Sequence, residues 1–120
     1  MSDQDFEAAA AFLEEYALRP PRAEPHNPAV DSPRWRTIQI QLRDLARRLR
    51  QAGKAGAVEF RDADAQFLET QSSRLFRMHH WIRRGLPLAP DAAAMADTAQ
   101  ITAERLPLIA AMIRQKIARP

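Results

Sequence analysis

Hydrophobic residues recur with the period of an α-helix in four segments of the chain. Two of these segments lie in the first half, at residues 3–18 and 33–52. The apolar positions of the first are Phe6, Ala9, Leu13, Tyr16 and Ala17. Those of the second are Trp35, Ile38, Leu42, Leu45 and Leu49. The second set forms a heptad-like seam, which needs a partner helix to cover it.

The third and fourth helical segments occupy residues 62–84 and 91–118. In the third, the core positions Leu75, Met78 and Ile82 follow the polar run "ETQSS" at 69–73. In the fourth, one face carries Met95, Ala99, Leu106, Ala110, Ile113 and Ile117. Pro107 lies within this segment and predicts either one bent helix, which we favour, or two helices.

No segment alternates apolar and polar residues with the period of a strand. The pattern therefore predicts an all-α fold, a single domain of four to five helices across residues 1–120. Residues 20–33 hold five of the nine prolines and predict an extended linker between the first two helices. Pro33 in a first helical turn and Gly53 after the last one mark the ends of the second helix.

Composition is that of an ordinary globular protein, with 46% hydrophobic and 28% charged residues. The chain has no cysteine, which excludes disulfides and thiolate metal ligands. The acidic first residues do not resemble a signal peptide, and no apolar run approaches 18 residues. We therefore expect a cytoplasmic protein that does not enter a membrane.

Basic residues concentrate in the second helix, where seven lie between residues 34 and 54 against the single acid Asp44. Four of them project opposite the apolar seam, with no acid four positions before any of them: Arg36, Arg43, Arg47 and Arg50. This stripe fits three interpretations. It is a solvated face, it contacts nucleic-acid phosphates, or it is covered by the first-helix acids Glu7, Glu14 and Glu15.

The stretch "RLFRMHHWIRRG", residues 74–85, suggests a metal site at first sight. However, His79 and His80 lie about 100° apart on a helix, and no ligand stands three or four positions from either. We therefore expect no metal. Arg77 and Arg84 lie one turn on either side of Trp81, within cation–π reach, and could add to an anion or nucleic-acid contact.

Surplus apolar residues form a second stripe on the fourth segment, opposite its core face: Ile101, Leu108 and Met112. A helix that is apolar on both sides is either central in a bundle or buried against another chain. Phe76, about 140° from the core direction of its helix, and Ile40, outside the seam, add to this surplus.

Catalytic signatures are absent from the sequence. There is no cysteine nucleophile, no Gly-x-Ser-x-Gly and no His-Glu-x-x-His. The three glycines of the chain do not form a glycine-rich phosphate-binding loop. Asp62 and Asp64 are the acids expected at a helix start. The sequence predicts a non-catalytic, cofactor-free protein-binding module, an accessory, adaptor or regulatory subunit that self-associates. The alternative is a nucleic-acid-binding regulator that uses the arginine stripe.

Overall fold

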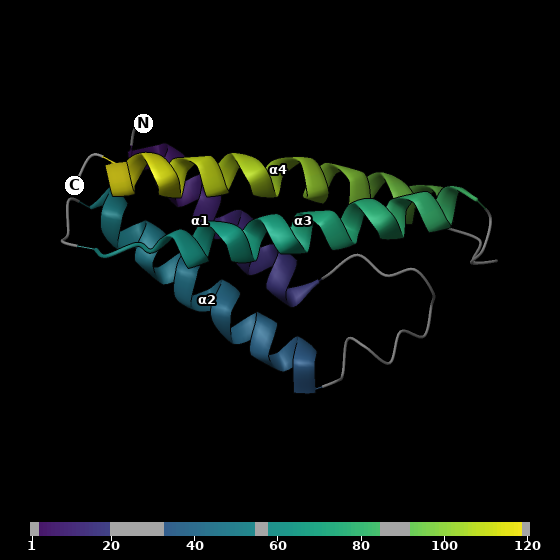
Figure 1. The fold of residues 1–120 in the computed structure, drawn as a ribbon, viewed down its shortest axis with the longest axis horizontal. Coiled ribbons are helices and arrows are strands. Elements are labelled where there is room, and N and C mark those ends of the chain that lie inside the picture. The colour runs from purple at the N-terminus through teal and green to yellow at the C-terminus, as the bar shows by residue number, and fades with distance from the viewer. Residues whose placement is uncertain (1–2, 20–32, 55–57, 85–91, 119–120) are drawn as a thin grey trace. The chain divides into compact units, whose positions relative to one another are not determined.

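The computed structural model describes residues 3–19, 33–54, 58–84 and 92–118. Their regular secondary structure is entirely α-helical, with no strand (Figure 1). Four helices follow in order: α1 (Asp3–Leu18), α2 (Pro33–Gly53), α3 (Asp62–Arg83) and α4 (Ala92–Ala118). The all-α prediction is confirmed with four helices, because α4 continues through Pro107. The proline-rich segment lies outside the described residues except for Pro33.

The chain divides into two compact units, each built from two consecutive helices. The first holds α1 and α2 and extends to Glu59, and the second holds α3 and α4 from Phe60 onward. The expectation of a single domain stays a prediction. No helix in the described ranges is long and apolar enough to cross a membrane.

In the first unit, α1 and α2 pack through the predicted apolar faces. All five seam residues of α2 are buried, and they face a buried set on α1: Phe6, Ala9, Ala10, Leu13, Tyr16 and Ala17. The ring of Tyr16 meets that of Trp35 edge-on, with centroids 5.7 Å apart. The side-chain amide of Gln39 donates to the carbonyl oxygen of Ala17 at 2.8 Å, which satisfies a backbone group that the end of α1 leaves free.

In the second unit, α3 and α4 run antiparallel, side by side (Figure 1). The buried face of α4 includes four alanines and two large residues: Ala96, Ala99, Ala103, Leu106, Ala110 and Ile113. The alanines let the helices approach closely. The prediction for Ile117 is wrong, because this residue is 39% exposed near the end of the helix.

The buried face of α3 differs from the prediction, because it includes polar residues. Gln71, Ser72 and His79 are buried with Leu68 and Leu75. Two residues of the polar run at 69–73, Gln71 and Ser72, are therefore part of the core, whereas Thr70 and Ser73 are exposed.

Ser72 contacts α4 where Pro107 interrupts the backbone hydrogen bonds of the helix. Proline has no backbone N–H, so the carbonyl of Ala103, four residues earlier, receives no helical hydrogen bond from it. The Ser72 hydroxyl donates to this carbonyl oxygen at 2.5 Å. A side chain of α3 thus supplies the missing donor, which explains how α4 stays continuous with a proline inside it.

The acids at the start of α3 act as the sequence predicts. The carboxylate of Asp64 accepts the backbone N–H of Arg61 at 2.9 Å, in the manner of a capping residue. Asp62 accepts from Gln66 and also pairs with Arg114 of α4 at 3.1 Å. Both carboxylates therefore have structural roles.

Candidate interaction surfaces

The second apolar stripe of α4, hereafter the outer stripe, consists of Ile101, Leu108 and Met112. Ile101 is 55% and Leu108 66% exposed, whereas Met112 is partly buried. On the opposite side of the helix, Leu106 and Ile113 are fully buried. Helix α4 thus has a completed core face and, about 140° away from it, a separate exposed apolar line.

The other two predicted interface residues, Ile40 and Phe76, lie on other helices than the outer stripe. Ile40 is 67% exposed on α2, in the first unit. Phe76, on α3, is only 38% exposed. Because Ser72 and His79 belong to the buried face, Phe76 lies about 70° from the core direction, and the predicted angle is too large.

Two exposed apolar residues were not among the predicted interface positions. Leu18, in the last turn of α1, is 60% exposed, and Ile117 near the end of α4 is the other. Leu18 falls outside the apolar face of its own helix, which is the signal that could have identified it.

Arg50 of the arginine stripe is covered by the first helix. Its guanidinium lies 2.9 Å and 3.0 Å from the two carboxylate oxygens of Glu7 and 2.5 Å from one of Glu14. The hydrogen bond from Arg50 lowers the pKa of Glu14 below its ordinary value. Glu15, the third acid considered, instead lies 3.7 Å from Arg19. The covering interpretation thus holds for Arg50, through two of the three acids.

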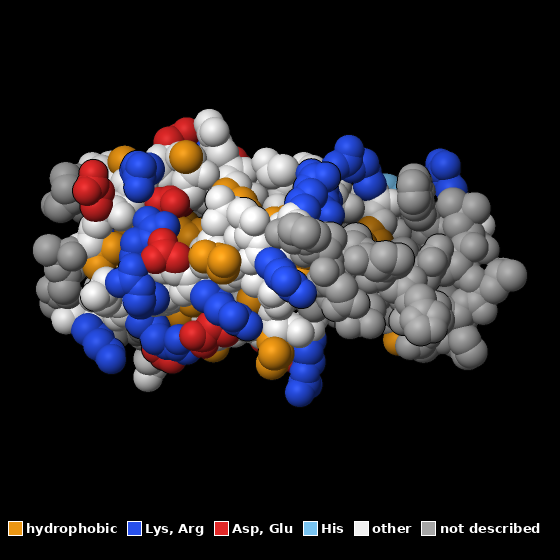
Figure 2. All heavy atoms as spheres, turned by 90° about the horizontal axis from the view of Figure 1, so that it is seen from below, with side chains coloured by type: hydrophobic (Ala, Val, Ile, Leu, Met, Phe, Trp, Pro, Cys, Tyr) orange, Lys and Arg blue, Asp and Glu red, His pale blue; other side chains and the backbone are white. Residues whose placement is uncertain are grey.

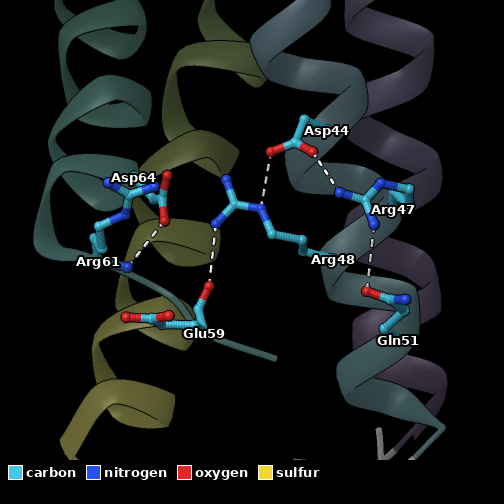
Figure 3. A network of polar contacts seen from close by, with 7 residues as sticks. All are labelled: Asp44, Arg47, Arg48, Gln51, Glu59, Arg61 and Asp64. Atoms are coloured by element: carbon cyan, nitrogen blue, oxygen red, sulfur yellow. Dashed lines mark hydrogen bonds and ion pairs between the residues drawn. The ribbon is translucent and has the colours of Figure 1, made fainter. Parts of the chain in front are cut away.

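Asp44 neutralises a second member of the stripe (Figure 3). Its carboxylate oxygens accept from Arg47 at 2.7 Å and from Arg48 at 2.9 Å. The Arg47 hydrogen bond is the main cause of a lowered pKa for Asp44. No acid stands four positions before a member of the stripe, but Asp44 lies three positions before Arg47, and this spacing also brings side chains together.

Arg48 continues this network to the end of the first unit. Its guanidinium also donates to the backbone carbonyl of Glu59 at 3.3 Å (Figure 3). Arg48 is therefore a structural residue that ties α2 to the segment following it.

Arg36 and Arg43 remain as exposed cations. Neither has an ion pair with any residue that the structure describes. Figure 2 shows how basic side chains gather on one face with acidic side chains between several of them and with separate apolar side chains exposed. The stripe is therefore a mixed-charge surface, in which two of the four arginines have carboxylate partners among the described residues.

The histidine pair of α3 divides between core and surface. His79 is buried, with Nδ1 3.3 Å from the carbonyl oxygen of Ala96, and His80 is exposed. The described residues contain no group of three side chains that could hold a metal ion. Arg77 and Arg84 are exposed, and the side chain of Trp81 lies outside the described residues. The predicted cation–π contact therefore stays a prediction.

An ion-pair cluster that the sequence did not predict joins α3 and α4. Arg114 donates to both carboxylate oxygens of Glu69, at 2.5 Å and 2.9 Å. The hydrogen bond lowers the pKa of Glu69. This bidentate contact fixes the register of α3 against α4 at the end of the second unit where α3 begins and α4 ends.

Replacing Glu14 by glutamine tests the pairing of Arg50. A lowered carboxyl pKa stabilises the fold above the ordinary glutamate value of 4.5, and this contribution disappears as the pH falls through the folded-state value. Since the pair is partly exposed, we expect Glu14→Gln to reduce the free energy of unfolding at pH 7 by about 0.2–1 kcal/mol. Urea unfolding at pH 7 and at pH 3 measures the difference, which should be smaller at the lower pH.

Glu15→Gln is the matched control. Among the described residues, its carboxylate contacts Arg19 at 3.7 Å and no other cation, so it should change the free energy of unfolding less than Glu14→Gln does. Equal losses from the two substitutions would contradict the role given to Arg50.

Comparison with known proteins gives no relative: no protein-family model, no curated protein and no solved structure matches this chain. The support for a function therefore comes from the surfaces described above.

Proposed function

We propose that this chain is a non-catalytic, cytoplasmic protein-binding module, an accessory, adaptor or regulatory subunit that associates through the outer stripe of α4. The observation that carries the proposal is the exposure of Ile101 and Leu108 on a helix whose opposite face is already a complete core.

Single exposed apolar residues are common on folded proteins and need no explanation. The outer stripe differs because Ile101 and Leu108 lie seven positions apart and so share one face, with Met112 one turn further. Covering such a line with another protein removes apolar surface from water, which is favourable by about 25 cal/mol per Å². Self-association is the form of binding that we favour.

The rival function, nucleic-acid binding by the arginine stripe, has less support. Arg47 and Arg50 already have carboxylate partners, which leaves Arg36 and Arg43 for phosphate contacts. Each neutralised arginine removes about one unit from the expected salt dependence of binding. Arg77 and Arg84 would have to supply the remaining contacts from the second unit.

The test replaces two residues of the outer stripe together, Leu108→Glu with Met112→Glu. We expect light scattering to show a smaller species, or capture of a partner from nuclease-treated lysate to be lost. Circular dichroism should show unchanged helicity. Association through apolar surface should persist when the salt concentration is raised, whereas phosphate binding weakens steeply.

A matched control adds the same two charges elsewhere on the second unit, as Thr70→Glu with Ser73→Glu. Both positions are exposed on α3, so this variant should keep the association of the original chain. If the outer-stripe variant unfolds while the control does not, the stripe is interior core and the proposal is overturned. Equal association by both variants would also overturn it.

A further inference from the structure

We propose that a second copy of this chain docks on the outer stripe through its helix α2, with α4 of one copy and α2 of the other running antiparallel. Glu104 then lies between two exposed arginines of the partner subunit. The partner's Ile40 lies between Ile101 and Leu108. This inference rests on the proposed function and gives it a specific partner, face and orientation.

The exposed face of α2 has an apolar residue between two cations. Ile40 is 67% exposed, and it follows Arg36 by four positions and precedes Arg43 by three. Both arginines are exposed, and neither has an ion pair with a residue that the structure describes. At 100° per residue, Ile40 projects about 50° from the line through the two arginines. A matching surface therefore needs an acid that fits between the cations and apolar side chains that cover Ile40.

The outer stripe of α4 has the reciprocal pattern, an acid between two apolar residues. Glu104 is exposed, and it follows Ile101 by three positions and precedes Leu108 by four. It projects about 50° from the line through these two residues. With the N-terminus of each helix at the top, the charged positions of α2 and of α4 lie on the same side of the apolar ones. Arg105, on the other edge of the outer stripe, has no role in this pattern.

The spacing of the two patterns selects the antiparallel orientation. Reversing one helix turns the spacing of four and three on α2 into the three and four of α4, so Glu104 and the partner's Ile40 reach the same height. The rise of 1.5 Å per residue then places one arginine about a turn above Glu104 and the other about a turn below. Reversal also brings the charged edges of both helices to one side of the contact and the apolar edges to the other.

A parallel pairing would bring opposite edges together instead. The partner's Ile40 would then face Glu104, and the two arginines would face the apolar residues of the outer stripe. A carboxylate covered by an apolar side chain loses water and gains no partner, which opposes association. The antiparallel pair therefore fits both faces, because it gives Glu104 two cations and covers Ile40 with Ile101 and Leu108.

The neighbouring charges on the same edge agree with this contact. In the same register, Asp97 lies at the height of the partner's Arg47. Each is also ion-paired within its own chain, Asp97 with Arg83 at 2.6 Å and Arg47 with Asp44 at 2.7 Å. The hydrogen bond that Glu104 accepts from its own helix, at 3.1 Å, leaves its second carboxylate oxygen for another donor. Across this edge, acids of α4 thus face arginines of α2.

The contact joins two different faces of the chain and is therefore heterologous. A copy that docks through its outer stripe keeps its own α2 face for a further copy, unless two copies close into a ring. The contact covers only three large exposed apolar residues, so it is smaller than the roughly 800 Å² per partner of a standard stable complex. We expect weak association that increases with protein concentration.

Disulfide trapping tests the faces and their orientation, because the chain has no cysteine of its own. Ile40→Cys mixed with Leu108→Cys should form a mixed disulfide faster than either variant crosslinks with itself. Asp97→Cys mixed with Arg47→Cys should also crosslink, whereas in a parallel pair these positions would lie about 20 Å apart. Preferential self-crosslinking of Leu108→Cys, or failure of the second mixture, would overturn the inference.

Charge exchange between two variants tests the contact of Glu104. One variant carries Glu104→Arg, and the other carries Arg36→Glu with Arg43→Glu. Each alone places like charges together, so we expect self-association to weaken by roughly 10-fold or more. A mixture of the two should recover the affinity of the original chain, because every contact between the variants again joins opposite charges.

Glu15→Arg is the matched control, because it makes the same charge change as Glu104→Arg at an exposed position of α1. It should leave self-association unchanged. A mixture of the two exchange variants that stays as weak as its components would overturn the inference. Variants that each associate as tightly as the original chain would overturn it as well.

The inference and the proposed function fail in different ways. If the purified chain remains monomeric at millimolar concentration, the inference is overturned. It is also overturned if Leu108→Glu with Met112→Glu abolishes self-association and Arg36→Glu with Arg43→Glu does not. In that case the outer stripe still binds another surface, and the proposed function stands. Absence of any binding that depends on the outer stripe would overturn both.

Discussion

Leu106→Ala is expected to lower the free energy of unfolding by about 2–5 kcal/mol, because it leaves a cavity where a fully buried side chain stood. Leu106 is 0% exposed and lies on the core face of α4 between buried Ala103 and Ile109. Urea unfolding followed by circular dichroism at 222 nm, a wavelength that reports helix content, measures the change.

Leu108→Ala is the matched control for this substitution. It removes the same atoms from the same helix only two positions away, but from a side chain that is 66% exposed. We expect its effect on the free energy of unfolding to stay within about 0.5 kcal/mol. Equal losses from the two substitutions would mean that both faces of α4 are interior, and the outer stripe would not be an interface.

The second large effect concerns Ser72 and Pro107. Ser72→Ala removes the donor to the Ala103 carbonyl and leaves a buried acceptor without a partner. We expect a loss of about 1–3 kcal/mol in the free energy of unfolding. Pro107→Ala restores the backbone N–H that donates to this carbonyl in an uninterrupted helix. It also removes a proline from a helix interior, where proline destabilises a helix by about 3 kcal/mol.

A double-mutant cycle measures the dependence of one residue on the other. In the Pro107→Ala background, the carbonyl has a helical donor, so Ser72→Ala should cost much less than it does in the original chain. The same loss in both backgrounds would show that the Ser72 hydroxyl does not compensate for the proline.

The four helices could be predicted because each has a regular apolar period and clear end signals. Pro33 at the start of α2 and Gly53 at its end agree with the known preferences of helix termini. The bounds of all four helices differ from the expected ones by at most one residue. Local sequence determines these features, so no knowledge of distant contacts was needed.

The polar part of the core could not be predicted, because its reason lies on another helix. Ser72 and His79 appear as interruptions of the apolar pattern of α3 until the carbonyls of Ala103 and Ala96 are placed beside them. A hydrophobic period contains no information about which buried carbonyl needs a donor. The loss of the Ala103 helical bond was nevertheless implied by Pro107 in the sequence.

The candidate surfaces could be predicted only in part, because some of their contacts also lie on another helix. Helical position alone places Ile40 outside its seam and places Ile101 and Leu108 opposite the core face, but it leaves open whether another helix covers them. The structure shows that these three residues are exposed. Glu7 and Glu14 are partners of Arg50 because α1 packs against α2. The sequence alone did not decide whether the arginine stripe is solvated, contacts phosphates or is covered by the first helix. The Arg114 contact with Glu69 depends on the register of α3 and α4 in the same way.

The most direct test of the binding role of the outer stripe is the alkylation rate of the Leu108→Cys thiol. The chain offers no other thiol, and Thr70→Cys provides an exposed reference on α3. We expect rapid labelling of the dilute purified chain. Labelling of Leu108→Cys, but not of Thr70→Cys, should slow as the concentration rises or when nuclease-treated lysate is added. Equal rates for the two positions under every condition, or slow labelling of Leu108→Cys even in the dilute chain, would contradict the account.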